Sequence, residues 1–139
     1  MKQPPWLAIA AALSLMACAA HAADMDEAIK YRRNLMSANG GLMGATNAIL
    51  QKKVDDKGRL AVYAQALAGL NKHVAALFPN GSNVGDTDAL PDVWTKRAEF
   101  ERRAKEVEVK AAAFARSQTP TAFKDLAEAC KSCHKDFRK

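Results

Sequence analysis

The stretch of sequence that decides the fold is PTAFKDLAEACKSCHKDFRK, residues 120–139. Its apolar side chains recur every three or four residues, which is the spacing of one face of a helix. They are Phe123, Leu126, Cys130, Cys133 and Phe137. Thr119 suits the N-cap of such a helix, and Pro120 suits its first residue. We therefore expect a helix over about 120–138 that places two thiols on its apolar side.

Three further helices are predicted upstream, because apolar residues there repeat every seven positions. The predicted helices span about 24–52, 59–78 and 91–116. Turn-forming residues separate them in DDKG at 55–58, PNGSNVGDTD at 79–88 and SQTP at 117–120. Gly40 and Gly41 interrupt the first helix, at a cost of ~1 kcal/mol each relative to alanine. Four amphipathic helices joined by short links predict an all-α fold, an antiparallel four-helix bundle.

The first 24 residues, MKQPPWLAIAAALSLMACAAHAAD, differ from the rest of the chain. One lysine precedes an apolar run, and a small-x-small site follows at residues 20–22, which is the pattern of a secretory signal. We expect a signal peptide over 1–22 and a single domain over 23–139 that is exported to the periplasm. One alternative is a retained anchor. Another is cleavage within LMAC at 15–18, which would leave a lipid on Cys18 and bring the protein to a membrane surface.

The charge of the chain limits its partners. The formal net charge of +6 falls to +5 without residues 1–22, since Lys2 is their single charged residue. This modest basic balance suits an acidic partner protein or a membrane surface, and it is equally compatible with a solvated surface. No dense block of Lys and Arg with interleaved aromatic residues occurs, so a nucleic-acid partner is not expected.

Cys130, Cys133 and His134 form the motif C-x-x-C-H, which is an attachment signature for haem c. Residues three apart share a helix face, so both thiols can bond to vinyl groups along one porphyrin edge while His134 binds the iron. A disulfide between them would close almost no chain. A zinc site would need a fourth ligand, for which only His73 is plausible, and a thioredoxin-like site would need a preceding strand. The expected cofactor is covalently bound haem c, one per chain.

The segment after residue 22 resembles the class II cytochromes c, the family of cytochrome c prime and its low-spin, methionine-ligated relatives. The matching stretches are IKYRRNLM at 29–36, LFP at 77–79, TDALPDVW at 87–94 and CKSCHKDFR at 130–138. They occur in the family's order, and a haem motif near the C-terminus distinguishes this family from the class I cytochromes. The resemblance implies a four-helix bundle in which His134 is the proximal ligand to the iron.

The resemblance also implies that Met36 faces the open side of the iron. In low-spin members a methionine here binds the iron, and in some cytochromes c prime it lies there without bonding. The stretch LMSANGG at 35–41 looks more like the low-spin branch. We therefore expect an electron carrier with His134 and Met36 as axial ligands, and Met43 as a weaker candidate. The alternative is a five-coordinate cytochrome c prime that binds small gases such as nitric oxide or carbon monoxide.

Three charged residues are placed near the haem by the same resemblance. It implies that Arg32 meets a propionate, that Asp88 lies near the haem edge and that Arg138 lies beside the proximal histidine. Each has a simpler interpretation, as a surface arginine, a turn residue and a fraying chain end respectively. By contrast, we expect Arg97 to extend from the bundle seam to solvent and His73 to lie at the surface.

The expected partners are redox proteins that the sequence does not identify, or a single enzyme complex served by this protein. The family implies a homodimer through the first two helices, although the apolar stripes are accounted for by the core of one bundle. Enzyme activity is not expected, because no acid–base residue suited to catalysis is evident on the open side of the haem.

Overall fold

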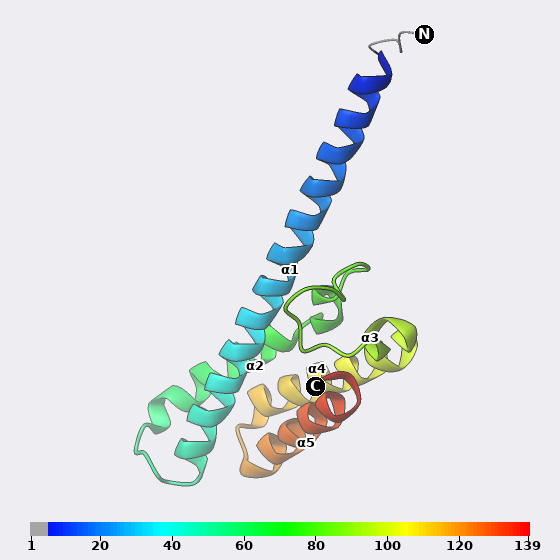
Figure 1. Ribbon diagram of the computed structural model, residues 1–139. Coiled ribbons are helices and arrows are strands. Elements are labelled where there is room, and N and C mark those ends of the chain that lie inside the picture. The colour runs from blue at the N-terminus through cyan, green and yellow to red at the C-terminus, as the bar shows by residue number, and fades with distance from the viewer. Residues whose placement is uncertain (1–5) are drawn as a thin grey trace.

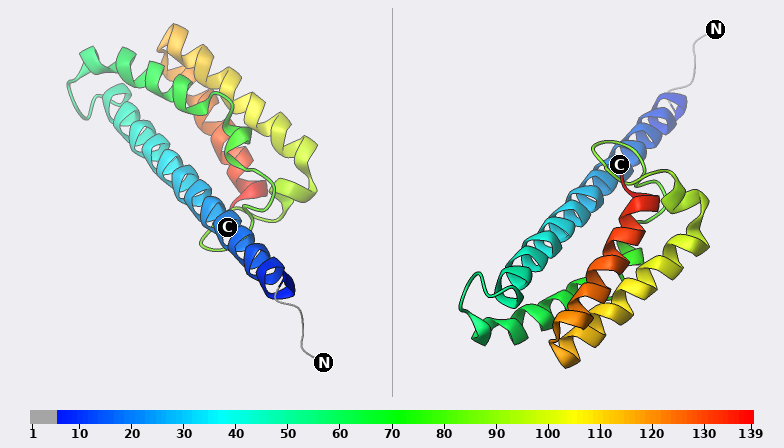
Figure 2. Two further views of the ribbon diagram at one scale, coloured as in Figure 1. Left: turned by 90° about the horizontal axis from the view of Figure 1, so that it is seen from above. Right: turned by 90° about the horizontal axis from the view of Figure 1, so that it is seen from below.

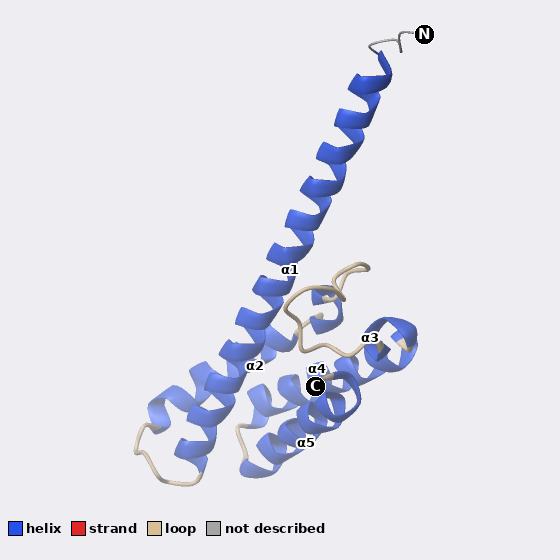
Figure 3. Cartoon of the chain, viewed as in Figure 1, coloured by secondary structure: helices blue, strands red, loops and turns tan. Residues whose placement is uncertain are grey.

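The computed structural model describes residues 6–139, with side chains from residue 24 onward (Figure 1). Its elements in chain order are α1 (Trp6–Leu50), η1 (Lys57–Arg59), α2 (Leu60–Asn71), η2 (Val74–Leu77), α3 (Asp92–Thr95), α4 (Arg97–Ser117) and α5 (Pro120–Phe137). Helices make up the regular structure of this range (Figure 3), apart from one isolated bridge between Ala89 and Arg138. None of the helices in the described part is long and apolar enough to cross a membrane.

The predicted signal peptide over 1–22 and the alternative lipid site at Cys18 lie outside the residues whose side chains the structure describes. Residues 1–5 lie outside it entirely, so both features stay predictions.

Helices α1, α2, α4 and α5 form the predicted four-helix bundle (Figure 2). Helix α1 packs on α2, α2 on α4, and α4 on α5, whereas α1 and α5 make few close contacts. The fully buried Leu67, Phe114 and Leu126 lie in the core, and the ring of Phe114 packs against Phe123 at a centroid distance of 5.4 Å. Burial of each such side chain stabilises the fold by about 1.5–3 kcal/mol. One side of the bundle is thus well packed, and the side between α1 and α5 is not.

The predicted second helix, 59–78, is wrong beyond Asn71. Lys72 is extended and His73 adopts a left-handed conformation with φ of 56°, so α2 ends there and a short 3₁₀ turn, η2, follows. The guanidinium of Arg97 donates hydrogen bonds to the carbonyls of Ala75 at 3.0 Å and Phe78 at 2.9 Å. These bonds satisfy carbonyl groups that a continuous helix would have paired internally. Arg97 therefore points inward to cap a turn, and our expectation that it extends to solvent is wrong.

The predicted third helix is split, and the fourth is confirmed. Lys96 departs from helical geometry and divides the segment into the single turn α3 and the long helix α4. Helix α4 ends at Ser117, and the next residue, Gln118, adopts a left-handed conformation with φ of 50°. Helix α5 then begins as predicted, with the Thr119 hydroxyl accepting a hydrogen bond from the backbone N–H of Ala122 at 3.2 Å.

Helix α1 runs without a break through Gly40 and Gly41. A side chain at either position would meet open space, so neither glycine is required by a close contact within the protein. The cost of two glycines in a helix interior is tolerated here because residues on both sides of them, from Ile29 to Ile49, are anchored in the fold.

Candidate haem site

Two adjoining cavities lie where α1 faces α5. Their volumes are about 360 and 580 Å³, within the range of cofactor sites in proteins. Five residues line both of them: Met36, Val74, Cys133, His134 and Arg138. We call the smaller one the first cavity and the larger one the second cavity. Together they form a continuous site along the poorly packed side of the bundle.

All seven residues predicted to contact the haem lie in the walls of these cavities. Arg32 and Asp88 line the first cavity, Cys130 lines the second, and the remaining four line both. Those four are Met36, Cys133, His134 and Arg138. The seven residues come from α1, from the loop before α3 and from the end of α5. The fold therefore brings together residues that are far apart in sequence. Met43 lines the second cavity, and His73 is exposed and lines neither.

The thiols and the imidazole are in the chemical state that haem attachment needs. Neither Cys130 nor Cys133 is in a disulfide, and Cys133 is buried. Burial raises the pKa of the Cys130 thiol, and burial together with the neighbouring Cys130 raises the pKa of Cys133 to about 11. Burial and the nearby Arg138 charge lower the pKa of His134. The imidazole is therefore neutral at pH 7, which is the form that binds a metal.

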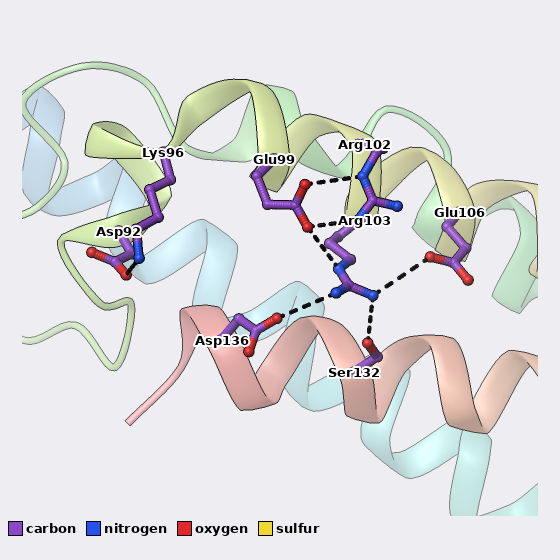
Figure 4. Close-up of polar contacts among 8 residues, drawn as sticks. All are labelled: Asp92, Lys96, Glu99, Arg102, Arg103, Glu106, Ser132 and Asp136. Carbon is purple, nitrogen blue, oxygen red and sulfur yellow. Dashed lines mark hydrogen bonds and ion pairs between the residues drawn. The ribbon is translucent and has the colours of Figure 1, made fainter.

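A polar network fixes the rotation of α5 against α4 (Figure 4). The Arg103 guanidinium donates to the Ser132 hydroxyl at 2.7 Å and lies 3.5 Å from the Asp136 carboxylate. It also donates to Glu99 on its own helix at 3.1 Å. Ser132 stands between the two cysteines and Asp136 follows His134 closely in the chain. Arg103 thus ties the side of α5 that carries Ser132 and Asp136 to α4, while Cys130, Cys133 and His134 line the cavities that α1 also lines.

The end of the chain is held against the loop that follows η2. The backbone N–H of Leu90 donates to the carbonyl of Phe137 at 2.9 Å, and that of Lys139 donates to the carbonyl of Asp88 at 2.8 Å. The Lys139 ammonium donates to the Thr87 carbonyl at 3.1 Å. Arg138 is therefore fixed at the cavity rim beside Asp88, and the interpretation of it as a fraying end is wrong.

Arg32 is a buried cation whose protein partners are neutral. It is 3% exposed and donates to the Ser82 hydroxyl at 2.9 Å, the Ser82 carbonyl at 3.1 Å and the Thr87 hydroxyl at 2.7 Å. Its guanidinium carbon lies 4.5 Å from the centre of the Phe78 ring, an arrangement that also stabilises a cation. No carboxylate of the described residues lies within ion-pair distance of it. Burial lowers the pKa of Arg32 accordingly.

A haem fits these residues. The two thiols and the neutral imidazole share the side of α5 that lines the cavities, and a buried charge is stable when a counter-charge accompanies it. A propionate in the first cavity would supply that counter-charge to Arg32. A zinc ion fits this site less well than a haem does. No group of three or more His, Cys, Asp or Glu side chains in the described range is arranged to hold a metal ion.

Sequence reasoning missed three sets of residues at this site. They are the Arg103 network, the Ser82 and Thr87 acceptors around Arg32, and a pair of asparagines, Asn39 and Asn71. Each set joins segments separated by 29–55 residues. No local pattern could have indicated these pairings, because they depend on how the helices approach one another.

Comparison with known proteins identifies the family. A family model described as cytochrome c' matches residues 27–138. The cytochrome c' of Pararhodospirillum photometricum is 30% identical over 79% of this chain and 94% of its own length. The cytochrome c-554 of Cereibacter sphaeroides is 31% identical over 99% of this chain and 98% of its own length. Cytochrome c prime from Shewanella frigidimarina superposes with a TM-score of 0.77 at 28% identity, covering 83% of this chain and 96% of that one.

The expectation of a low-spin electron carrier is corrected by this comparison. The matching family model and most of the relatives and solved structures are named cytochrome c'. That is the five-coordinate branch, which was the alternative to the low-spin electron carrier. The stretch LMSANGG at 35–41 misled because a methionine at this point occurs in both branches of the family. Met36 lies in the cavity wall as predicted, but the reason for expecting it to bind iron falls with the low-spin interpretation. The chain belongs to the cytochrome c' family and carries one covalently bound haem c.

Proposed function

We propose that this protein binds small gases, such as nitric oxide or carbon monoxide, at a haem iron held by His134. The observation that carries the proposal is the wall that α1 presents to the second cavity, in which Met36, Gly40 and Met43 are apolar and face a cavity also lined by His134 of α5. The chain's membership of the cytochrome c' family supports the same function. When bound, the haem supplies an iron with one open coordination position, and an unbonded Met36 would leave that position free for a gas.

Four residues of the site have distinct parts in this function. Cys130 and Cys133 tether the haem, so that it is retained even where other contacts are weak. The neutral His134 binds the iron, and Arg32 neutralises a propionate. The wall around these groups is largely apolar, with Val74, Phe78 and Phe100 among its members. An apolar wall of this kind favours entry of uncharged diatomic molecules over ions.

The cellular setting of the protein follows from the same proposal. Covalent attachment of haem c is completed outside the cytoplasm, which agrees with export of the protein to the periplasm by the segment over 1–22. Ferrous iron is needed to bind carbon monoxide, so a redox partner would have to reduce the protein. A homodimer through α1 and α2 also stays a prediction.

The test uses the full chain, expressed in a host that matures c-type cytochromes. We expect the purified protein to weigh as much as the polypeptide plus one haem, and its ferrous spectrum to be high-spin and to shift on addition of carbon monoxide. The variant Met36→Ala should keep the high-spin spectrum and still bind carbon monoxide. A low-spin ferrous spectrum that carbon monoxide leaves unchanged would contradict the proposal.

A further inference from the structure

The wall of the second cavity contains a reciprocal pair of amides, one from α1 and one from α2. The Asn39 amide donates to the Asn71 carbonyl oxygen at 3.3 Å, and the Asn71 amide donates to the Asn39 carbonyl oxygen at 2.9 Å. Both side chains line the cavity, and Asn71 is 5% exposed. This pair is the polar exception among the α1 and α2 residues of a wall that also contains Met36, Met43 and Val74.

The hydrogen bonds of the pair use every amide hydrogen except one on Asn39. Asn71 uses both of its amide hydrogens, one on Asn39 and one on the Leu67 carbonyl at 2.8 Å. An asparagine amide has two hydrogens, and Asn39 uses one of them on Asn71. Within the described residues its second N–H has no acceptor. The bond to the Leu67 carbonyl fixes which end of Asn71 donates, and the reciprocal pairing then fixes the orientation of Asn39 as well.

Asn39 lines the same cavity as Met36, the residue that the family resemblance places on the open side of the iron. It follows Met36 by three residues on α1, so the two side chains share a face of the helix. Both line the second cavity together with Cys133 and His134 of α5. The spare N–H therefore belongs to the wall from which Met36 approaches, on the side of the haem site remote from α5.

We propose that Asn39 donates a hydrogen bond to the gas bound beside Met36, and that Asn71 positions the Asn39 amide. The inference rests on the proposed function and deepens it by naming a residue that determines ligand preference. Hydrogen-bond donors on the open side of a haem decide which diatomic ligands are stabilised. A polar ligand such as nitric oxide accepts the bond better than carbon monoxide does. The site therefore prefers nitric oxide beyond what an apolar wall alone would give.

The experiment compares haem-loaded wild type with Asn39→Leu, which removes the donor and approximately keeps the volume. We expect nitric oxide to leave the ferrous variant about threefold to tenfold faster, the effect of one lost hydrogen bond. We also expect the stretching vibration of bound carbon monoxide to move to a higher wavenumber, since a donor near the ligand lowers it. The matched control is Asn34→Leu, the same change at an exposed position of α1 outside both cavities, and it should alter neither quantity.

Two further variants guard against a purely structural effect. Asn39→Leu leaves the buried Asn71 oxygen without a donor, so the double variant Asn39→Leu/Asn71→Leu removes both members and restores a consistent apolar wall. It should show the same change in nitric oxide release as Asn39→Leu. Asn71→Leu keeps the donor but frees its orientation, and we expect a smaller change.

The outcomes separate the inference from the function beneath it. If the wild type binds no carbon monoxide, the proposed function fails and the role of Asn39 fails with it. If the wild type binds carbon monoxide but Asn39→Leu matches Asn34→Leu in vibration and in nitric oxide release, the function stands and the role of Asn39 is overturned.

Discussion

The two cavities share a wall but differ in the polar groups that surround them. The first is closed partly by the loop before α3 and contains the buried charge of Arg32, held by Ser82 and Thr87. The second is walled by helices and contains the neutral pair Asn39 and Asn71. A permanent charge suits a permanent counter-charge such as a propionate, and a weak donor suits a ligand that comes and goes. The haem site spans both cavities, since Cys133 and His134 line both of them, and the difference separates a wall suited to a propionate from a wall suited to a neutral ligand.

The largest expected effect comes from removing the two α5 thiols that line the cavities. In Cys130→Ala/Cys133→Ala the haem has no covalent tether, so we expect a denatured sample to have the mass of the polypeptide alone. Mass spectrometry and a haem stain of a denaturing gel check this. The single variant Cys130→Ala is the control and should retain haem through Cys133. A double variant that kept covalent haem would mean that the tether lies elsewhere.

The next largest effect tests the first cavity. In the haem-loaded protein, Arg32→Met removes a buried donor and leaves the Ser82 and Thr87 oxygens short of partners, so we expect the free energy of unfolding to fall by about 2–4 kcal/mol. Denaturant unfolding measures it. Arg33→Met is the control, because Arg33 is exposed and its ion pair with Asp86 is at the surface, where such pairs contribute about 0–1 kcal/mol. Equal effects of the two substitutions would show that the Arg32 environment is not specially stabilised.

A smaller effect is expected from removing Arg103, which connects α4 to α5. Arg103→Met keeps the apolar stem but loses the bonds to Ser132 and Asp136, and we expect a loss of about 1 kcal/mol in the free energy of unfolding. Arg102→Met removes a neighbour that shares the Glu99 partner but is 58% exposed, so its loss should stay below about 0.5 kcal/mol. The comparison isolates the contact with α5, because of these two arginines Arg103 is the one that reaches across to that helix (Figure 4).

The smallest effect is a dependence on pH. The hydrogen bond from Arg102, followed by that from Arg103, lowers the pKa of Glu99 below its usual value of 4.5. A lowered pKa stabilises the folded state above the usual value, and this stabilisation is lost as the pH falls through the folded-state pKa. The variant Glu99→Gln should therefore be slightly less stable than wild type at pH 7, and the difference should shrink as the pH falls below 4.5. A difference that grew in acid would contradict this assignment.

The sequence predicts some parts of the molecule well because their signals are local. Thr119, Pro120 and the spacing of the apolar residues fix the start and face of α5, and the C-x-x-C-H motif fixes the cofactor. The break after Asn71 was missed because Val74 and Leu77 continue the seven-residue repeat on a 3₁₀ turn. That turn depends on Arg97, which belongs to another helix.

The candidate site was predicted from family motifs, but its supporting contacts were not. Motif residues such as His134 and Arg32 could be named from the sequence, whereas the partners of Arg32 lie 50 and 55 residues away. Ligation by Met36 could not be decided, because the residue type is the same whether or not the sulfur bonds to iron. What distinguishes these cases is three-dimensional placement and the cofactor's own chemistry.

The uncompensated charge of Arg32 has a consequence for how the cell would manage this protein. A polypeptide that has not received its haem must keep a cation out of water with only neutral neighbours, so it should unfold more readily than the finished product. A haem that is bound only by the folded chain would shift the folding equilibrium toward the folded state. Proteolysis would then fall mainly on copies without haem, and haem attachment itself would decide which molecules survive.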